Sequence, residues 1–161
     1  MEIERKFLVK YLPDGLEDNV KKEVSQGYIS VDPVIRIRRS NDRYFLTVKT
    51  SGLLAREEFE TDITAESFDN LRGKCDGNII SKTRYKIPCG DYVAELDIFH
   101  EIFEGLRYVE VEFPSLEEAE AFTPPDYFGR ELTGDARYQN SSLSKMKKED
   151  ISSFLESVKA L

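Results

Sequence analysis

The sequence predicts an α+β fold, in which a largely antiparallel sheet of eight strands is accompanied by a few helices. Eight short segments alternate apolar and polar residues, which is the period of a strand with one buried face. Turn residues separate most of these segments over hairpin-length connections, and such connections join antiparallel neighbours. The expected strands are 2–9, 22–31, 34–40, 43–50, 55–63, 78–87, 91–99 and 107–113.

Three short helices are expected, and each follows a recognisable signal. Ser115-x-x-Glu118 is a capping box that opens a helix ending at about residue 122, before two consecutive prolines. Thr64 can cap a second helix. The third is an amphipathic C-terminal helix after Asp150, whose apolar residues recur at helical spacing: Ile151, Phe154, Leu155 and Val158.

Composition limits the classes of function. The 161 residues suit one domain, taken as residues 1–161, that can bury a sizeable core. A net charge of −8 argues against nucleic acid as the main partner, because nucleic-acid binding relies on clustered cations. No apolar run has the length of a membrane span, so no membrane partner is expected. The oligomeric state is left open between a monomer and a homodimer.

Cysteine and histidine usage predicts the compartment and the kind of metal. Cys75 and Cys89 lack metal-type spacing and suggest thiols in a reducing cytoplasm. With His100 as the single histidine, a histidine-based metal site is not expected. Any metal would be bound by oxygen, which favours Mg²⁺ or Mn²⁺.

Alternation places ionisable residues on one face of nearly every strand. In the first strand Glu2, Glu4 and Lys6 lie opposite Ile3 and Phe7. The corresponding sets in the later strands are Arg36 and Arg38; Thr47 and Lys49; Arg56, Glu58, Glu60 and Asp62; Lys82 and Arg84; Glu95 and Asp97; and Glu110 and Glu112.

These ionic faces indicate a class of ligand. If the sheet closes, they line a lumen while the apolar faces pack outward against the helices. Inward charges at this density need water, one another, or a ligand that matches both signs. A polyphosphate with divalent metal ions does so, because arginine and lysine bind phosphoryl oxygens while carboxylates bind the metal. The same groups would neutralise charge that develops during phosphoryl transfer.

The motifs also resemble a known family. Glu2-Ile3-Glu4-Arg5-Lys6 matches the ExExK signature of the CYTH, or triphosphate tunnel metalloenzyme, superfamily, and the likeness extends over nearly the whole chain. One departure is Ser81, where an acidic residue is expected before Lys82. Further segments that look like its successive motifs are 26–29, 36–39, 47–49, 56–60, 82–85, 95–97, 109–112 and 133–138.

The resemblance implies an eight-stranded antiparallel β-barrel, a tunnel with a charged lumen, that binds a small-molecule triphosphate and divalent metal. Members of the superfamily include inorganic triphosphatases, thiamine triphosphatases, class IV adenylyl cyclases and RNA triphosphatases. The compact length, and a tail ending in Arg137-Tyr138-x-Asn140, look most like the short bacterial inorganic triphosphatases.

Each charged residue can be given an expected role. Hard oxygen ligands suit Mg²⁺ or Mn²⁺. The candidate metal ligands are Glu2, Glu4, Glu95, Asp97, Glu110 and Glu112. The candidate triphosphate ligands are Lys6, Arg36, Arg38, Lys49, Lys82, Arg84 and Arg137, with Arg39 and Arg56 as weaker candidates.

The expected reaction is metal-dependent hydrolysis of tripolyphosphate to pyrophosphate and phosphate, with nucleoside triphosphates as poorer substrates. The nucleophile should be water, because no Ser, Cys or His arrangement offers a covalent one. The candidates for proton transfer are Lys6, Tyr28, Glu58, Glu60 and Lys82, which sequence does not rank. The alternatives are a class IV-type adenylyl cyclase, a thiamine triphosphatase, and a non-catalytic module that binds polyphosphate or nucleotide.

Overall fold

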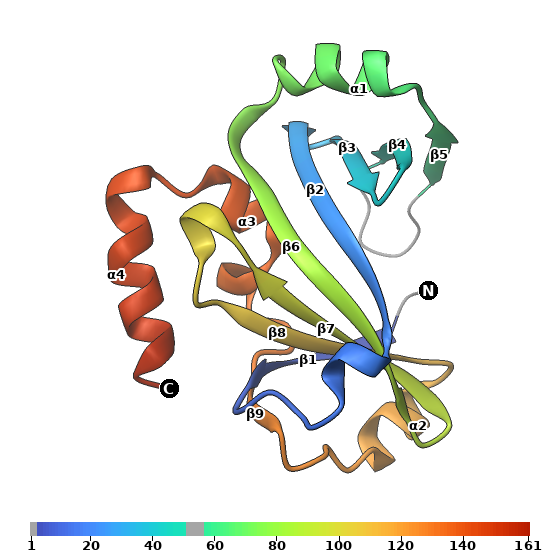
Figure 1. Cartoon of the computed structure of the whole chain (residues 1–161), viewed down its shortest axis with the longest axis vertical. Coiled ribbons are helices and arrows are strands. Elements are labelled where there is room, and N and C mark those ends of the chain that lie inside the picture. The colour runs from blue at the N-terminus through green and yellow to red at the C-terminus, as the bar shows by residue number, and fades with distance from the viewer. Residues whose placement is uncertain (1–2, 51–56) are drawn as a thin grey trace.

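Nine antiparallel strands form one sheet in the computed structural model, which describes residues 3–50 and 57–161. The strand order is β5-β4-β3-β2-β6-β7-β8-β1-β9, and the long strands β2 and β6 join the two parts of the sheet (Figure 1). The strands are β1 (Ile3–Val9), β2 (Val20–Val31), β3 (Val34–Ser40), β4 (Arg43–Lys49), β5 (Glu58–Asp62), β6 (Asp76–Cys89), β7 (Tyr92–Phe99), β8 (Arg107–Phe113) and β9 (Phe128–Glu131).

The eight predicted strands and their antiparallel pairing are confirmed, with ends that shift by up to two residues within the described ranges; the predicted residues 2, 55 and 56 lie outside those ranges. Two features differ from the expectation. The short strand β9 was not predicted and pairs with β1. In the part of the chain that the structure describes, the hydrogen-bonded order is also linear, with β5 and β9 at its two edges, rather than closed into an eight-stranded barrel.

Four α-helices lie in the described ranges: α1 (Ala65–Arg72), α2 (Leu116–Ala121), α3 (Asn140–Lys145) and α4 (Lys148–Lys159). The predicted caps are present, because the Thr64 side chain accepts a hydrogen bond from the Ser67 N–H and the Ser115 side chain accepts one from Glu118. Helix α1 packs on β3 and β4, α2 on β1 and β8, and α3 on β6 (Figure 1). None of the helices that the structure describes is long and apolar enough to cross a membrane.

The two faces of the sheet carry different cores. The outer face is apolar on β1, β7 and β8, where residues such as Leu96, Val109 and Val111 are fully buried in a cluster that includes Ala119 of α2. This arrangement confirms that the apolar faces pack outward against a helix. Hydrophobic burial is the main favourable term in folding. Apolar packing on the outer face therefore fixes the strands, and the strands fix the positions of the ionic side chains on the other face.

The inner, ionic face becomes apolar towards one end. Two residues beyond Lys6, Asp97 and Lys82 along their strands lie Leu8, Phe99 and Ile80, on the same face by alternation. These three side chains join a second core cluster with Tyr138, Leu143 and Ile151 from the C-terminal elements. The C-terminal segment therefore covers one end of the ionic face and leaves the charged end uncovered by this cluster.

Candidate functional site

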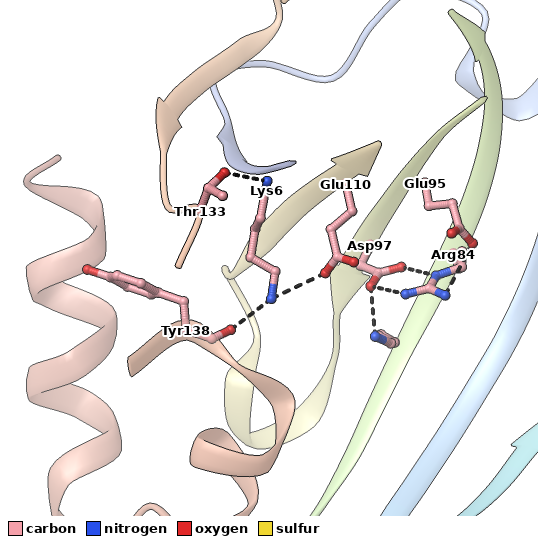
Figure 2. A network of polar contacts seen from close by, with 8 residues as sticks. Lys6, Arg84, Glu95, Asp97, Glu110, Thr133 and Tyr138 are labelled. Atoms are coloured by element: carbon pink, nitrogen blue, oxygen red, sulfur yellow. Dashed lines mark hydrogen bonds and ion pairs between the residues drawn. The ribbon is translucent and has the colours of Figure 1, made fainter. Parts of the chain in front are cut away.

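A buried cluster of opposite charges occupies the middle of the inner face. The Lys82 ammonium donates to Asp97 Oδ2 at 2.7 Å, and Arg84 donates from Nε to Oδ1 at 2.8 Å and from Nη2 to Oδ2 at 2.9 Å. Arg84 also forms an ion pair with Glu95 at 3.2 Å. The register explains this cluster, because Arg84 lies directly opposite Asp97 across β6 and β7 (Figure 2).

Burial and charge act differently on the two partners at the centre. Burial is the largest influence on Lys82, and together with repulsion from Arg84 and Arg38 it outweighs the attraction of Asp97, so its pKa falls to about 8. Burial would raise the pKa of Asp97, but attraction from Lys82 and hydrogen bonds from Arg84 lower it to about 2. The centre therefore has a fixed carboxylate and more cationic charge than that carboxylate can neutralise.

Lys6 reaches the same face from β1. Its ammonium is 3.2 Å from Glu110 Oε1 and donates to the Tyr138 carbonyl oxygen at 3.1 Å. Its backbone N–H donates to Thr133 Oγ1 at 3.0 Å (Figure 2). The ammonium also lies 4.8 Å from the centroid of the Tyr108 ring. The tail that follows β9 thus fixes both the strand and the side chain of Lys6.

Two arginines project from β3 in the other part of the sheet. Arg38 Nε donates to the side chain of Gln26 at 2.8 Å, and Arg36 donates to Thr47 Oγ1 at 3.4 Å. Burial, followed by repulsion from Arg36 and Arg84, lowers the pKa of Arg38 to about 10. Arg38 therefore lies near enough to Arg84 for the two guanidinium groups to repel one another.

The remaining candidate residues in this part of the sheet lie on β2, β4 and β5, next to β3 or one strand further away. The Thr47 hydroxyl donates to Glu60 Oε2 at 2.9 Å and accepts a hydrogen bond from Arg36, so Thr47 links the Glu60 carboxylate to the Arg36 guanidinium. Tyr28 is buried directly opposite Arg36. Lys49 and Glu58 are opposite one another, where β4 and β5 pair.

Carboxylates also face one another across neighbouring strands. Glu4 lies opposite Glu112 in β1 and β8, and Glu95 lies opposite Glu110 in β7 and β8. Like charges in directly opposite positions are unfavourable unless a cation lies between them. The donors are all hard oxygens, the ligand type that Mg²⁺ and Mn²⁺ prefer, but among the described residues no group of three or more such side chains is arranged to hold a metal ion. A pocket of about 480 Å³ adjoins these carboxylates, and its lining includes Glu95, Glu112 and Lys86.

Some predicted residues lie outside this arrangement. Both oxygens of Asp97 already receive hydrogen bonds from cations, so its structural role is that of a counter-ion. Arg137 is largely exposed and forms an ion pair with Asp135 at 2.6 Å, and it is not joined to the inner cations by any contact within the described ranges. Arg39 is exposed and donates to the Asn41 carbonyl. Glu2 and Arg56 lie outside the described residues.

Sequence reasoning missed three polar residues on the inner face as candidates for the site. Lys22 lies opposite Arg84, Lys86 lies opposite Glu95, and Gln26 accepts a hydrogen bond from Arg38. They could have been found by applying the same alternation to uncharged residues, to the first half of β2 and to the end of β6. Thr47 was placed on this face from the sequence, but its contacts with Arg36 and Glu60 were not predicted.

Comparisons with known proteins agree with this architecture. Residues 1–148 match the model of the CYTH domain family. The chain is 43% identical over 148 residues to an inorganic triphosphatase of Nitrosomonas europaea, covering 89% of this chain and 96% of that protein. It is 40% identical to an inorganic triphosphatase of Acetivibrio thermocellus, covering 89% of this chain and 93% of that protein.

A solved structure shows the same fold. The crystal structure of an inorganic triphosphatase superimposes with a TM-score of 0.76 at 38% identity, covering 91% of this chain and 96% of that chain. Family model, relatives and solved structure each span most of the sequence. The chain belongs to the CYTH domain family.

Proposed function

We propose that this protein hydrolyses inorganic tripolyphosphate to pyrophosphate and phosphate, with Mg²⁺ or Mn²⁺ as cofactor and nucleoside triphosphates as poorer substrates. The observation that carries the proposal is the surplus of buried cationic charge around Asp97, beside opposed carboxylates, in a chain 43% identical to a protein named inorganic triphosphatase. Bound polyphosphate would neutralise the cations, and bound metal would neutralise the acids.

The chain's cations would bind and orient the substrate. Lys6, Arg36, Arg38, Lys49, Lys82 and Arg84 would contact phosphoryl oxygens, and Asp97 would hold Lys82 and Arg84 in place. Catalysis of phosphoryl transfer depends mainly on such positioning and charge neutralisation. A water oxygen would form a bond to the terminal phosphorus while the bridging P–O bond breaks and pyrophosphate leaves.

The proton of that water needs an acceptor. We assign it to Glu60, because Thr47 fixes this carboxylate beside Arg36, which would hold a phosphoryl oxygen. Lys82 is less suited, since its ammonium is needed as a buried cation against Asp97. Glu58, Tyr28 and Lys6 remain the other candidates.

We assign the metal to Glu4 and Glu112, with Glu95 and Glu110 beside them. When bound, a divalent ion supplies electrophilic activation of phosphoryl oxygens. The ion pairs of Glu95 with Arg84 and of Glu110 with Lys6 would keep the acids and the phosphate-binding cations in contact. Glu2 would belong to the same set by alternation.

The test uses purified protein with Mg²⁺ or Mn²⁺ and, separately, tripolyphosphate, ATP and thiamine triphosphate. Released phosphate and cyclic AMP are both measured. We expect phosphate release to be fastest from tripolyphosphate. Cyclic AMP as the main product from ATP would identify a cyclase instead, and binding without turnover under either metal would identify a non-catalytic module.

Glu4→Gln tests the metal assignment. We expect it to abolish turnover without unfolding the chain, whereas Glu120→Gln, which alters an exposed acid on α2, should leave turnover unchanged. Full activity of folded Glu4→Gln would show that this row of acids is not the metal site.

We also propose a cytoplasmic location. Cys75 and Cys89 are both free thiols, which is the state that a reducing compartment maintains.

A further inference from the structure

Gln26 lies at the centre of β2 on the ionic face, and its side chain is entirely buried. In the register it is opposite Arg38 of β3 on one side and Ile80 of β6 on the other. It therefore sits where the two parts of the sheet meet. A buried neutral amide among cations must satisfy one acceptor and two N–H donors.

The orientation of this amide is fixed by chemistry. Arg38 Nε can only donate, so the atom that it contacts at 2.8 Å must be the carbonyl oxygen of Gln26. The amide nitrogen then points away from Arg38. Within residues 3–50 and 57–161 this Nε2 has no hydrogen-bond partner, although it is buried. Leaving such a donor unpaired is unfavourable.

A second unpaired donor lies close by. Arg36 Nε is also buried without a partner in the described ranges, and Arg36 is two residues from Arg38 on the same face of β3. Burial, followed by repulsion from Arg36 and Arg84, already disfavours the cationic form of Arg38 and lowers its pKa. Donors and cations gathered in one place require a ligand that brings acceptors and negative charge.

We propose that Gln26 is a positioning residue for Arg38 and that its own amide N–H group donates to a phosphoryl oxygen of the bound triphosphate. The carbonyl oxygen holds the guanidinium at Nε, so that the terminal nitrogens stay available to the ligand. The amide nitrogen adds an uncharged donor to the face that carries Arg38 and Arg36. This inference rests on the proposed function, since it takes tripolyphosphate as the ligand.

Two substitutions separate the functions of the two ends of the amide. Gln26→Met keeps the length but removes both the acceptor and the donor. Gln26→Glu keeps an oxygen for Arg38 and replaces the N–H group with a second oxygen that repels phosphate. Ser25→Ala, a neighbour on the opposite face of β2, is the matched control.

We expect Gln26→Met to raise the KM for tripolyphosphate by about 10- to 100-fold, the effect of losing hydrogen bonds to charged groups. Gln26→Glu should raise it at least as much, although it keeps the contact to Arg38. A purely structural role would instead lower the active fraction, and hence kcat, without changing KM. Ser25→Ala should match the wild type in both constants.

Dependence on Arg38 is tested with a double-mutant cycle. Arg38→Lys removes Nε, and its effect on KM should combine with that of Gln26→Met less than additively, because both break the same contact. Full additivity would show that Gln26 does not act through Arg38. If Gln26→Met fails to fold, as judged by its thermal unfolding, Gln26→Leu, which also removes both the acceptor and the donor, takes its place in the cycle.

The failure of this inference is distinguishable from failure of the proposed function. Wild-type protein that folds but hydrolyses no tripolyphosphate contradicts the proposed function; calorimetric titration with tripolyphosphate in EDTA then tests Gln26 by binding alone. Wild-type turnover together with an unchanged KM in both Gln26 variants overturns the inference about Gln26 and leaves the proposed function standing. In the titration, equal affinity of the wild type and Gln26→Glu for tripolyphosphate also overturns the inference about Gln26.

Discussion

Asp97 is the residue on which fold and site depend together. Its side chain is 2% exposed, and it receives one hydrogen bond from Lys82 and two from Arg84. The desolvation cost of such a buried cluster is offset only while the charges remain paired. The inner face thus uses a carboxylate to keep two cations buried and correctly oriented before any ligand binds.

Removing this charge should weaken the whole molecule. We expect Asp97→Asn to lower the free energy of unfolding by about 3–5 kcal/mol, because two buried cations lose their counter-ion. Urea unfolding monitored by circular dichroism measures the change. Asp62→Asn, which affects an exposed ion pair with Arg43, should change the stability by less than about 1 kcal/mol. Equal effects of the two substitutions would contradict a structural role for the central cluster.

Lys82 predicts a pH dependence of stability. Its pKa falls from 10.5 in the unfolded chain to about 8 in the folded protein, chiefly through burial. Between these values the unfolded chain binds the proton more tightly, so the contribution of Lys82 to the free energy of unfolding rises with pH. The difference in that free energy between wild type and Lys82→Met should increase from about pH 8 to about pH 10.5. A decrease over this window would mean that the ion pair with Asp97 raises the pKa instead.

At the scale of elements, β6 connects the site to the C-terminal segment. Asn78 donates from its amide to the carbonyl oxygens of Leu143 at 2.9 Å and Met146 at 2.8 Å, at the end of α3. Beside it Gly77 has a φ of 84°, and a Cβ there would overlap the Ser144 carbonyl oxygen. The strand that carries Lys82 and Arg84 therefore also anchors the helices that cover the apolar end of the inner face.

Gly77→Ala tests this anchor. We expect it to lower the free energy of unfolding by more than about 1 kcal/mol, because it adds a backbone clash to an unfavourable positive φ. Gly90→Ala is the matched control: Gly90 also has a positive φ, of 61°, but a Cβ there meets open space. Equal losses in thermal and urea unfolding would show that the contact with α3 contributes nothing.

The alternation of apolar and polar residues predicted the strands whose sequences show it, and it missed the short elements whose sequences do not. The strands from Ile3 to Phe113 each have an ionic or apolar face, which sequence displays directly. Strand β9 has four residues and pairs with β1 alone, and α3 has six residues with little apolar periodicity. Both elements form because of tertiary contacts, and no local pattern marks them. The strand order likewise depends on pairings between strands far apart in the chain, such as β1 with β8 and β2 with β6.

The same reasoning predicted which face each charged residue shares, but not its partner. Strand register sets Asp97 opposite Arg84, with Lys82 diagonal to it, and Glu4 opposite Glu112. One sequence contains no direct information on register between strands far apart in the chain, such as β1 and β8, and the face on which a carboxylate lies does not say which groups its oxygens bind. This is why the sequence grouped Asp97 with the metal ligands, while the structure shows both of its oxygens bound to cations.

At the scale of the whole molecule, an acidic chain gathers several of its cations on one face of the sheet. The chain carries a net charge of −8, yet the cations Lys82, Arg84 and Arg38 gather at the centre of the ionic face. A surplus of acids elsewhere would repel a bare polyphosphate, and a divalent counter-ion reduces that repulsion. We therefore expect the molecule to bind a polyphosphate together with a divalent metal ion.

We expect this ionic face to hydrolyse inorganic tripolyphosphate, and phosphorus-31 NMR follows the substrate and both products in one sample. Purified protein is incubated with tripolyphosphate and Mg²⁺, and in parallel with Mn²⁺, for which samples are chelated before the spectra are recorded. The tripolyphosphate signals should disappear while pyrophosphate and phosphate appear in equal molar amounts, and EDTA added at the start should prevent this. Unchanged tripolyphosphate with both metals, in a sample shown to be folded, would contradict this expectation.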